Sequence, residues 1–414
     1  QSGGNREKWT YSTWVKKTLK VANSILINPI GVNIAFNSTH TLYMDVSGVG
    51  RIFETNALYR DVSAWYHIVV AFNTTDYSTV SAGQAKVYVN GVEQTFASTT
   101  NMSVGFDSGM NQSGVDIGIA RDESGDNNYA DYYLAETVLI DGQQLTPTDF
   151  GEFDEDSGIW KPIDVSGLTF GTNGFYLDYK DSANLGNDAN GGTDFTEGGL
   201  TAIDQTTDTP TNNFCTMNPL DTYNSPTITD GNTIINAGGS DKSLRSTIGI
   251  SSGKWYWEVN TTANNSANMG IINGEAVLTD GNSLQSVSTN SVIWEGNGGL
   301  LFKNGSSVTT EYSGGTATYG FAFDLDNGTL KLSQNGTFYN SGNAVVTGIT
   351  ADTYLPFFAP NGGGSPTEFK ANFGNPAYAI SSGNTDGNDR GNFEYAVPSG
   401  YLSLCTANLS EVLG

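Results

Sequence analysis

The amino-acid sequence predicts an all-β protein that contains two antiparallel β-sandwich domains. Helical periodicity is almost absent, whereas runs of alternating apolar and polar residues recur along the chain. Asn-Gly and Asp-Gly dipeptides separate many of these runs, and such dipeptides form the tight turns of hairpins. Charged residues make up only 15% of the chain and it contains 51 glycines, a composition that suits short strands joined by turns.

Three segments illustrate the predicted strands. Residues 86–96 (KVYVNGVEQTF) alternate on both sides of an Asn-Gly dipeptide and are predicted to form a hairpin with a two-residue turn. Residues 137–145 (TVLIDGQQL) have a similar corner at Asp-Gly. Residues 321–339 contain two Asn-Gly dipeptides separated by enough residues for one strand, which predicts a three-stranded meander.

The strand-like patterns fall into two blocks that are not repeats of one another. The first block spans residues 1–165 and the second spans residues 214–414. Residues 166–213 are predicted to be an irregular connector, because the apolar pattern is lost there in favour of Asp, Asn, Gly and Thr. Each block is long enough to bury a core of its own.

The net charge of -25 limits the classes of partner. A strongly acidic surface repels nucleic-acid phosphates and anionic membranes, so we expect neither as a partner. No apolar run approaches the ~20 residues of a membrane span, so we expect no membrane insertion. The chain has only two histidines, His40 and His67, so a Ser-His-Asp triad or a histidine metal site is not expected. We expect His67 to be a strand residue half inside the sandwich.

The two cysteines, Cys215 and Cys405, lie near the two ends of the second block. Sandwich termini often lie close together, so a disulfide between them is an open alternative that requires Cα atoms within about 7 Å. If the protein assembles in a reducing cytosol, its thiols stay reduced, and we expect both cysteines to be free.

The first block resembles the concanavalin A-like, laminin G-like sandwich family. The residues that carry the resemblance are 9–16 (WTYSTWVK), 64–72 (AWYHIVVAF), 87–91 (VYVNG) and 133–142 (YLAETVLIDG). The resemblance implies that these segments are core strands. The strand that the family places before Trp9 is missing, and we therefore expect the chain to be a segment of a longer polypeptide.

The second block resembles SPRY domains, which are sandwiches of bent antiparallel sheets. Four segments match in order and spacing: 253–259 (GKWYWEV), 320–330 (GFAFDLDNGTL), 354–358 (YLPFF) and 397–401 (VPSGY). The match implies that Trp255, Trp257, Phe321 and Phe323 are core residues. It also implies that the residues from Asp324 onward form a hairpin turn.

The join between the blocks is similar to long structural proteins of marine tailed bacteriophages. The similarity rests on residues 134–136, 140–147, 150–158, 174–178, 208–214 and 218–220. It implies a virion exterior protein, part of a tail fibre, appendage or capsid-attached fibre, that adheres to a host cell-surface glycan or protein. Its partners would be other virion proteins, and we expect a homo-oligomer, with a trimer favoured.

Three alternatives remain open: a purely structural module that decorates or cements the virion, a secreted or cell-surface bacterial adhesin, and a polysaccharide-degrading enzyme. The best catalytic candidate is the acidic segment 152–156, because retaining glycosidases place two carboxyl groups about 5 Å apart. A Glu-x-Asp-x-x-Glu motif would need Glu at position 157, which is Ser157. We interpret the segment as an acidic turn and expect no catalysis.

Two oxygen-rich segments are calcium candidates, because laminin G-like domains carry this ion on loops. The first is the loop with Asp122, Asp126, Asn127 and Asn128. The other is the stretch with Asp181, Asn187, Asp188, Asn190 and Asp194. Ca²⁺ takes about six to eight oxygen ligands, and either segment would supply part of that set. We otherwise expect no cofactor.

Aromatic residues outside the matched segments are the candidates for ligand contact. Trp294 and Tyr312 lie in surroundings that the resemblance constrains least, and we predict that they are exposed and bind the ligand.

Overall fold

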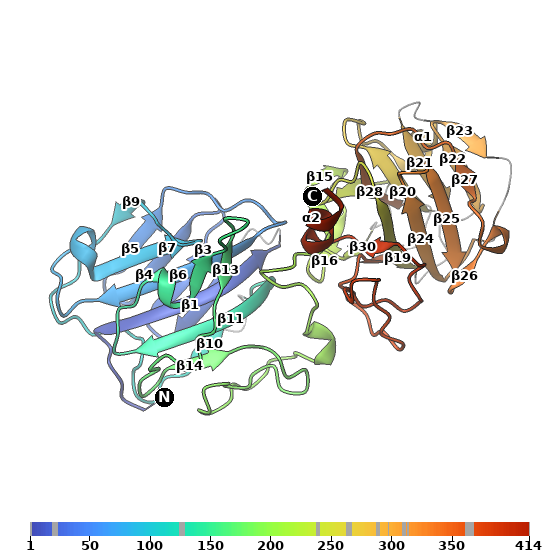
Figure 1. The fold of residues 1–414 in the computed structure, drawn as a ribbon. Helices are drawn as coiled ribbons and strands as arrows, with labels where there is room; N and C mark the ends of the chain where they lie inside the picture. The colour runs from blue at the N-terminus through green and yellow to red at the C-terminus, as the bar shows by residue number, and fades with distance from the viewer. Residues whose placement is uncertain are drawn as a thin grey trace. The chain divides into compact units, whose positions relative to one another are not determined.

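The structure is a computed structural model that describes residues 2–18, 24–123, 129–236, 241–261, 267–286, 290–296, 298–308, 312, 314–360 and 368–413. It divides into two compact units, Gln1–Gln205 and Thr206–Gly414 (Figure 1). Each unit contains two large sheets whose neighbouring strands are almost all antiparallel, which confirms the predicted all-β sandwich fold. Among the described residues, no helix has the length and apolar character needed to cross a membrane.

The first unit packs two six-stranded sheets face to face. Sheet A has the strand order β14 (Phe175–Leu177), β11 (Tyr132–Asp141), β1 (Lys8–Lys17), β6 (Trp65–Asn73), β7 (Ala85–Val89), β8 (Val92–Glu93). Sheet B has the order β10 (Ile117–Ile119), β2 (Ser24–Pro29), β3 (Val32–Phe36), β4 (Leu42–Val46), β5 (Gly50–Thr55), β9 (Phe96–Thr99). Alternate residues of each strand face the core between the sheets. There Trp9 of sheet A stacks on Phe72 at 4.8 Å between ring centroids.

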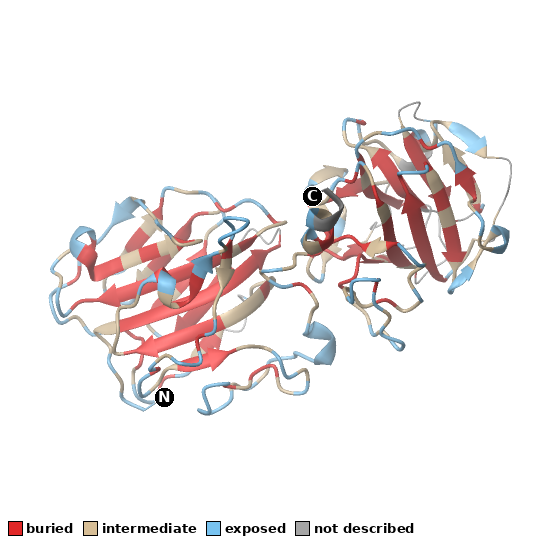
Figure 2. Cartoon of the chain, in the orientation of Figure 1, coloured by how far each residue is buried: buried red, intermediate tan, exposed pale blue. Residues whose placement is uncertain are grey.

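The outer face of sheet A is covered by the chain that follows β11. This segment contains the 3-10 helix η2 (Pro147–Asp149) and the hairpin of β12 (Gly151–Phe153) and β13 (Trp160–Pro162). Phe150 packs against Val69 and Val138, and Trp160 packs against Trp14 and Trp65. Sheet A is therefore buried on both faces, which explains the continuous burial along β1 and β6 in Figure 2.

Much of the expected connector packs on the first unit. Strand β14 pairs with β11, and Phe195 contacts Phe175 at 4.8 Å between ring centroids. The carboxylate of Asp188 is buried and accepts hydrogen bonds from the backbone N–H groups of Tyr176 and Asn190. Polar side chains thus hold the backbone where apolar periodicity is missing. The segment also contains the short helix η3 (Ala202–Asp204).

The second unit is a larger sandwich of two sheets. Sheet C has the order β15 (Met217–Tyr223), β18 (Ser243–Ser246), β28 (Tyr354–Pro360), β20 (Ala267–Asn273), β21 (Ser291–Glu295), β22 (Leu300–Lys303), β23 (Ser306–Val308). Sheet D has the order β16 (Thr227–Thr229), β17 (Ile234–Asn236), β29 (Glu368–Asn372), β19 (Lys254–Thr261), β24 (Thr318–Asp324), β25 (Thr329–Gln334), β26 (Thr337–Phe338). In addition, β27 (Val346–Thr347) pairs with β25 and β30 (Leu402–Ser403) pairs with β19.

Hairpins form in two of the three predicted segments, one in each unit, whereas β11 ends at Asp141 and residues 142–145 form no returning strand. Strands β7 and β8 turn at Asn90 and Gly91, both with positive φ, as a two-residue hairpin loop of type I′ requires. Strands β24, β25 and β26 form the predicted meander. The remaining helices are η1 (Val80–Gln84), η4 (Asn340–Gly342), α1 (Gly281–Gln285) and α2 (Thr406–Leu413).

The aromatic core of the second unit agrees with the sequence prediction. Trp255, Trp257, Phe321 and Phe323 are all buried, and Trp257 stacks on Phe323 at 5.1 Å between ring centroids. Asp324 begins the turn between β24 and β25, where its carboxylate accepts a hydrogen bond from the Asn327 backbone N–H at 3.0 Å. This part of the chain therefore serves packing and turn formation.

Candidate functional site

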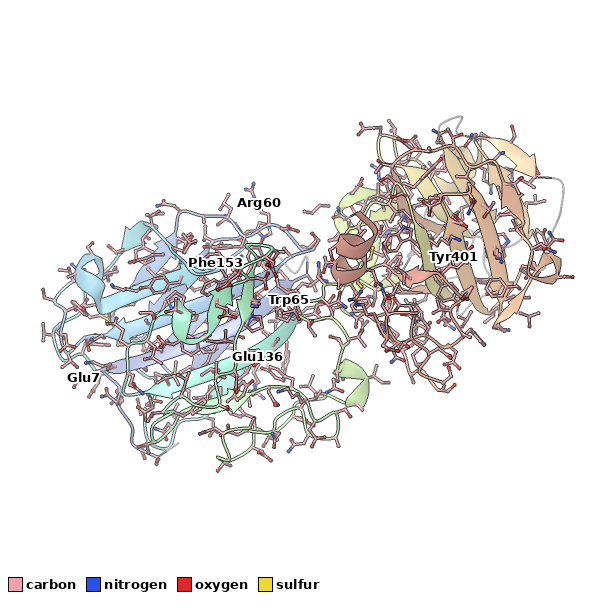
Figure 3. All side chains as sticks on the ribbon, in the orientation of Figure 1. Glu7, Arg60, Trp65, Glu136, Phe153 and Tyr401 are labelled. Atoms are coloured by element: carbon pink, nitrogen blue, oxygen red, sulfur yellow. The ribbon has the colours of Figure 1, made fainter. Side chains whose placement is uncertain are left out.

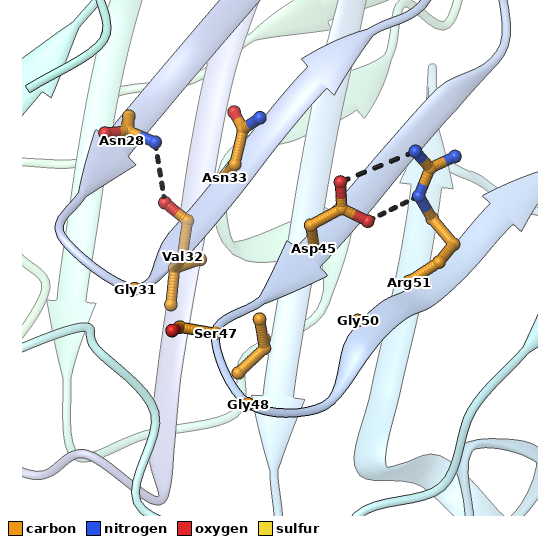
Figure 4. Close-up of a pocket in the computed structure, with 10 residues that line it drawn as sticks. Asn28, Gly31, Val32, Asn33, Asp45, Ser47, Gly48, Gly50 and Arg51 are labelled. Carbon is orange, nitrogen blue, oxygen red and sulfur yellow. Dashed lines mark hydrogen bonds and ion pairs between the residues drawn. The ribbon is translucent and has the colours of Figure 1, made fainter. Parts of the chain in front are cut away.

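A depression of about 570 Å³ opens at one end of sheet B in the first unit (Figure 4). It lies where the turns β2–β3 and β4–β5 meet, joined by a hydrogen bond of 2.9 Å from the Ser47 backbone N–H to the Gly31 carbonyl. Its lining consists of Asn28, Gly31, Val32, Asn33, Asp45, Val46, Ser47, Gly48, Gly50 and Arg51. We call this feature the sheet B depression.

A β-bulge positions the two charged side chains of the depression. The pairing of β4 with β5 runs from Met44 opposite Phe53 to Asp45 opposite Arg51, so Ile52 is the extra residue. Ile52 and Phe53 are both buried in the core. Asp45 and Arg51 consequently face each other across the two strands, as Figure 4 shows.

Three contacts hold the Arg51 guanidinium. Its Nε donates to the Asp45 carboxylate at 2.5 Å, and one terminal nitrogen donates to the Glu54 carboxylate at 2.7 Å. Its central carbon lies 3.9 Å from the centroid of the Tyr43 ring, a cation–π geometry. Because the side chain is 33% exposed, these contacts orient it without removing it from solvent.

The depression keeps hydrogen-bonding capacity for a ligand. A guanidinium carries five N–H donors, and Arg51 uses three of them among the described residues. The Asn33 amide donates to the Tyr43 hydroxyl at 3.3 Å, while its buried carbonyl oxygen has no hydrogen-bond partner in the described structure. Ser47 adds an exposed hydroxyl. Carboxylate, guanidinium and hydroxyl groups of Asp45, Arg51 and Ser47 therefore meet at one accessible place.

No motif or periodicity in the sequence marks these residues as a site. Asn33, Asp45 and Arg51 resemble ordinary outward-facing strand residues when they are considered one at a time. The signal that could have revealed them is the pair of opposite charges on either side of a glycine-rich turn, Asp45 and Arg51.

The histidine His67 is fully buried in the first unit and is held by two hydrogen bonds. The Trp160 indole N–H donates to Nδ1 at 2.9 Å, and Nε2 lies 2.8 Å from the Ser12 hydroxyl. Because an indole nitrogen can only donate, Nδ1 must be unprotonated, and the proton resides on Nε2. Nε2 therefore donates to Ser12 and cannot act as a general base toward it. Burial lowers the pKa of His67 to about 3.

The acidic segment 152–156 forms the exposed hairpin between β12 and β13. Its Asp154 accepts hydrogen bonds from the backbone N–H and the hydroxyl of Ser157 and from the Lys161 ammonium. These bonds hold the pKa of Asp154 well below its ordinary value. The arrangement is the turn that the sequence predicted.

Most of the first calcium candidate, with Asp126, Asn127 and Asn128, lies outside the described residues, and Asp122 is half-buried. In the second candidate, Asp188 accepts backbone N–H bonds and the Asp194 carboxylate accepts from Asn184 and from the backbone of Asp188. Within the described parts of the chain, no group of three or more His, Cys, Asp and Glu residues is arranged to hold a metal ion.

The prediction that Trp294 is an exposed ligand-binding residue is wrong. Trp294 has 0% exposure and packs on Tyr319 at 4.2 Å between ring centroids. Sheet C is covered on both faces at this point, so its neighbours Val292 and Ile293 are buried as well. Tyr312 is half-buried and contacts Tyr339 at 4.8 Å, so it packs on the core of the second unit.

Both cysteines are free and buried. Phe214 lies opposite Cys405 in an antiparallel bridge, so Cys215, one residue further on, points to the other face. Cys215 belongs to the main core of the second unit, whereas the Cys405 sulfur contacts the Ser403 hydroxyl at 3.7 Å. The alternation of side chains keeps the two sulfur atoms apart although the backbones are adjacent.

Comparison with known proteins gives structural similarities alone. No protein-family model matches the sequence, and no curated protein matches it. The SPRY domain of human HERC1 is similar over 37% of this chain and 96% of its own length, with 15% identity and a TM-score of 0.33. The TRIM65 PSpry domain is similar over 38% of this chain and 91% of its own length, with 13% identity and a TM-score of 0.31. Stonustoxin is similar over 38% of this chain and 28% of its own length, with 11% identity and a TM-score of 0.30.

Proposed function

We propose that this chain is a non-catalytic adhesive component of a tailed-bacteriophage virion that binds a host-surface glycan through the sheet B depression. The observation that carries the proposal is the partly exposed Asp45–Arg51 pair beside the exposed Ser47 in the sheet B depression. The hydroxyl groups of a saccharide both donate and accept hydrogen bonds. The Arg51 guanidinium can donate to them, and the Asp45 carboxylate can accept from them. Repeated copies on a fibre would turn weak single contacts into firm attachment.

The absence of catalysis is part of this proposal, and two site geometries support it. The Ser12–His67 pair has the wrong tautomer for nucleophilic catalysis, because Trp160 donates to Nδ1. The carboxylate of Asp154 is engaged by Ser157 and Lys161 in a turn. The placement on a virion exterior rests on the resemblance of residues 134–220 to phage structural proteins.

A glycan array probed with the fluorescently labelled, multivalent chain tests the binding proposal. Arg51→Gln removes the guanidinium, and we expect it to weaken binding to any positive glycan about tenfold, the loss of one or two charged hydrogen bonds. Lys86→Gln is the matched control, because it makes the same charge change on β7 of sheet A. If no glycan binds the wild-type chain, or if both variants bind equally, the depression is not a glycan site.

A second candidate, a purely structural module, is favoured by an apolar surface around Trp160. Val92, Phe153 and Ile159 are 58%, 56% and 64% exposed, and the Phe153 ring contacts Trp160 at 4.8 Å (Figure 3). Gly91, which precedes Val92, packs against the same indole ring. Exposed apolar side chains gathered in one place are typical of subunit contacts. Phe153→Ser would then lower the oligomeric state measured by analytical ultracentrifugation, for which we propose a trimer.

A further inference from the structure

Three basic side chains, Lys17, His40 and Arg60, come from segments that meet around Tyr59 at one end of the first unit. Lys17 is the last residue of β1, His40 lies between β3 and β4, and Arg60 directly follows Tyr59. The Tyr59 backbone links them, because its N–H donates to the His40 carbonyl at 2.8 Å and its carbonyl accepts from the Lys17 ammonium at 3.0 Å. These residues are far apart in sequence, and only the fold brings them together.

Lys17 is a buried cation without an anionic partner. Its side chain is 3% exposed, its Nζ lies 4.2 Å from the centroid of the Phe36 ring, and burial lowers its pKa to about 8. The Tyr59 carbonyl accepts one of its three N–H donors, and no carboxylate of the described residues lies within ion-pair distance. A buried charge is costly unless an opposite charge compensates it, so this end of the sandwich attracts an anion.

Arg60 places a second positive charge at the same end, and His40 adds an imidazole that can donate a hydrogen bond. Arg60 is exposed, lies at the rim of the first unit in Figure 3, and forms no ion pair among the described residues. The pKa of His40 is lowered by burial first and then by the charges of Lys17 and Arg60, so all three groups lie within electrostatic reach. The nearest acidic side chain in sequence, Asp61, is engaged by the backbone N–H and the hydroxyl of Ser63.

This cluster stands out against the rest of the chain, which has a net charge of -25. Six other cations of the first unit each have a carboxylate partner: Arg6, Lys8, Arg51, Arg121, Lys161 and Lys180. A chain so rich in carboxylates has supplied none to Lys17 or Arg60. Lys86 on β7 likewise forms no ion pair among the described residues, but it is partly exposed, whereas Lys17 is buried. The uncompensated charge of the buried Lys17 is therefore the feature that an external anion would explain.

We propose that Lys17, His40 and Arg60 form a binding site for a single oxyanion group, a carboxylate or a sulfate ester, over the backbone of Tyr59. The exposed Arg60 guanidinium offers its planar pair of donors to two oxygens, and His40 adds a third donor. Lys17 contributes its positive charge from the buried side of the site. The acidic remainder of the surface repels long polyanions, so the site selects an isolated anionic group, as on an acidic sugar. This site is separate from the sheet B depression and goes beyond the proposed function.

Calorimetric titration of the full chain with sodium sulfate and with sodium glucuronate at low ionic strength tests the proposal. Sodium chloride at matched ionic strength provides the reference. We expect saturable binding of at least one of the two probes and at least a tenfold loss of affinity in Arg60→Gln. Lys86→Gln, with the same charge change on β7, should bind as the wild type does. Circular dichroism checks that the exposed Arg60 substitution leaves the fold unchanged.

The two probes distinguish the source of the anion. Binding of sulfate alone assigns the site to sulfate esters, binding of glucuronate alone assigns it to carboxylates, and binding of both supports the shared oxyanion chemistry. Lys17→Met retains the apolar stem without the charge and should also abolish binding; if this variant does not fold, Arg60→Gln and His40→Gln decide the outcome. Absence of saturable binding, or equal loss in Arg60→Gln and Lys86→Gln, overturns the proposal.

Discussion

Replacing Glu258 with glutamine would remove a negative charge from the interior of the second unit while leaving the side-chain shape nearly unchanged. Glu258 lies in β19 with 0% exposure. One carboxylate oxygen accepts from the Tyr395 backbone N–H at 2.8 Å and the Tyr256 hydroxyl at 3.1 Å. The other accepts from the Glu394 backbone N–H at 3.0 Å and the Asn372 amide at 3.3 Å. The side chain thus holds the C-terminal segment, here the backbone at Glu394 and Tyr395, against sheet D through hydrogen bonds.

A glutamine cannot satisfy these four donors. Whichever way its amide points, the NH₂ group faces two donors, and at least one of them is a buried backbone N–H. Asn372 cannot turn to compensate, because its oxygen accepts from the Gly374 N–H and its nitrogen donates to the Asn392 carbonyl. A buried unsatisfied donor costs about 1–3 kcal/mol, so we expect Glu258→Gln to destabilise the second unit by about 3 kcal/mol.

Differential scanning calorimetry of the full chain measures this effect. For a unit of this size, a loss of about 3 kcal/mol corresponds to a decrease in Tm of roughly 6–12 °C in the transition of the second unit. Glu275→Gln is the control, because Glu275 is exposed and the charge change is identical. Equally small decreases in Tm in the two variants would refute the conclusion that the Glu258 carboxylate holds the C-terminal segment against sheet D.

Three further predictions follow from the structure. His67 has a depressed folded-state pKa of about 3, so its contribution to stability is complete above pH ~6.5 and is lost at about 1.4 kcal/mol per pH unit as the pH falls toward 3. The unfolding free energy of His67→Gln, measured with urea, should therefore depend less steeply on pH than that of the wild type. Equal slopes would contradict this prediction. Gly91 has a φ of 79°, and a Cβ added there would lie 2.8 Å from the Trp160 ring. Gly91→Ala should therefore lower the unfolding free energy of the first unit by about 1–3 kcal/mol in the same urea assay. An unchanged unfolding midpoint would contradict the close packing. Cys215 and Cys405 are buried, and burial raises the pKa of both thiols. Both should therefore react with a thiol reagent only after unfolding. Rapid labelling of the native chain would contradict their burial.

The sequence predicted those features that depend on local chemistry. The turn at Asn90 and Gly91 requires positive φ at two successive residues, and an Asn-Gly dipeptide is the strongest local signal for it. The resemblance of residues 320–330 to a SPRY segment similarly implied the core positions of Phe321 and Phe323, and both are buried. These signals lie within a few residues of one another, so a single sequence reveals them.

The features that the sequence did not predict depend on register and on burial of both sheet faces. Asp45 meets Arg51 only because a bulge at Ile52 shifts the pairing, and no local pattern indicates that shift. Trp294 was expected to be exposed, but sheet C is covered on both sides, where alternation no longer separates inside from outside. The cluster of Lys17, His40 and Arg60 around Tyr59 joins three segments that are distant in sequence.

A cryo-EM map of an intact tailed-phage particle that carries this chain would test the central claim most directly. The proposed function predicts that the chain lies on the exterior of the particle and that the sheet B depression, with Asp45 and Arg51, faces solvent. A map in which neighbouring subunits cover the depression, or in which the chain lies inside the particle, would contradict the adhesive role.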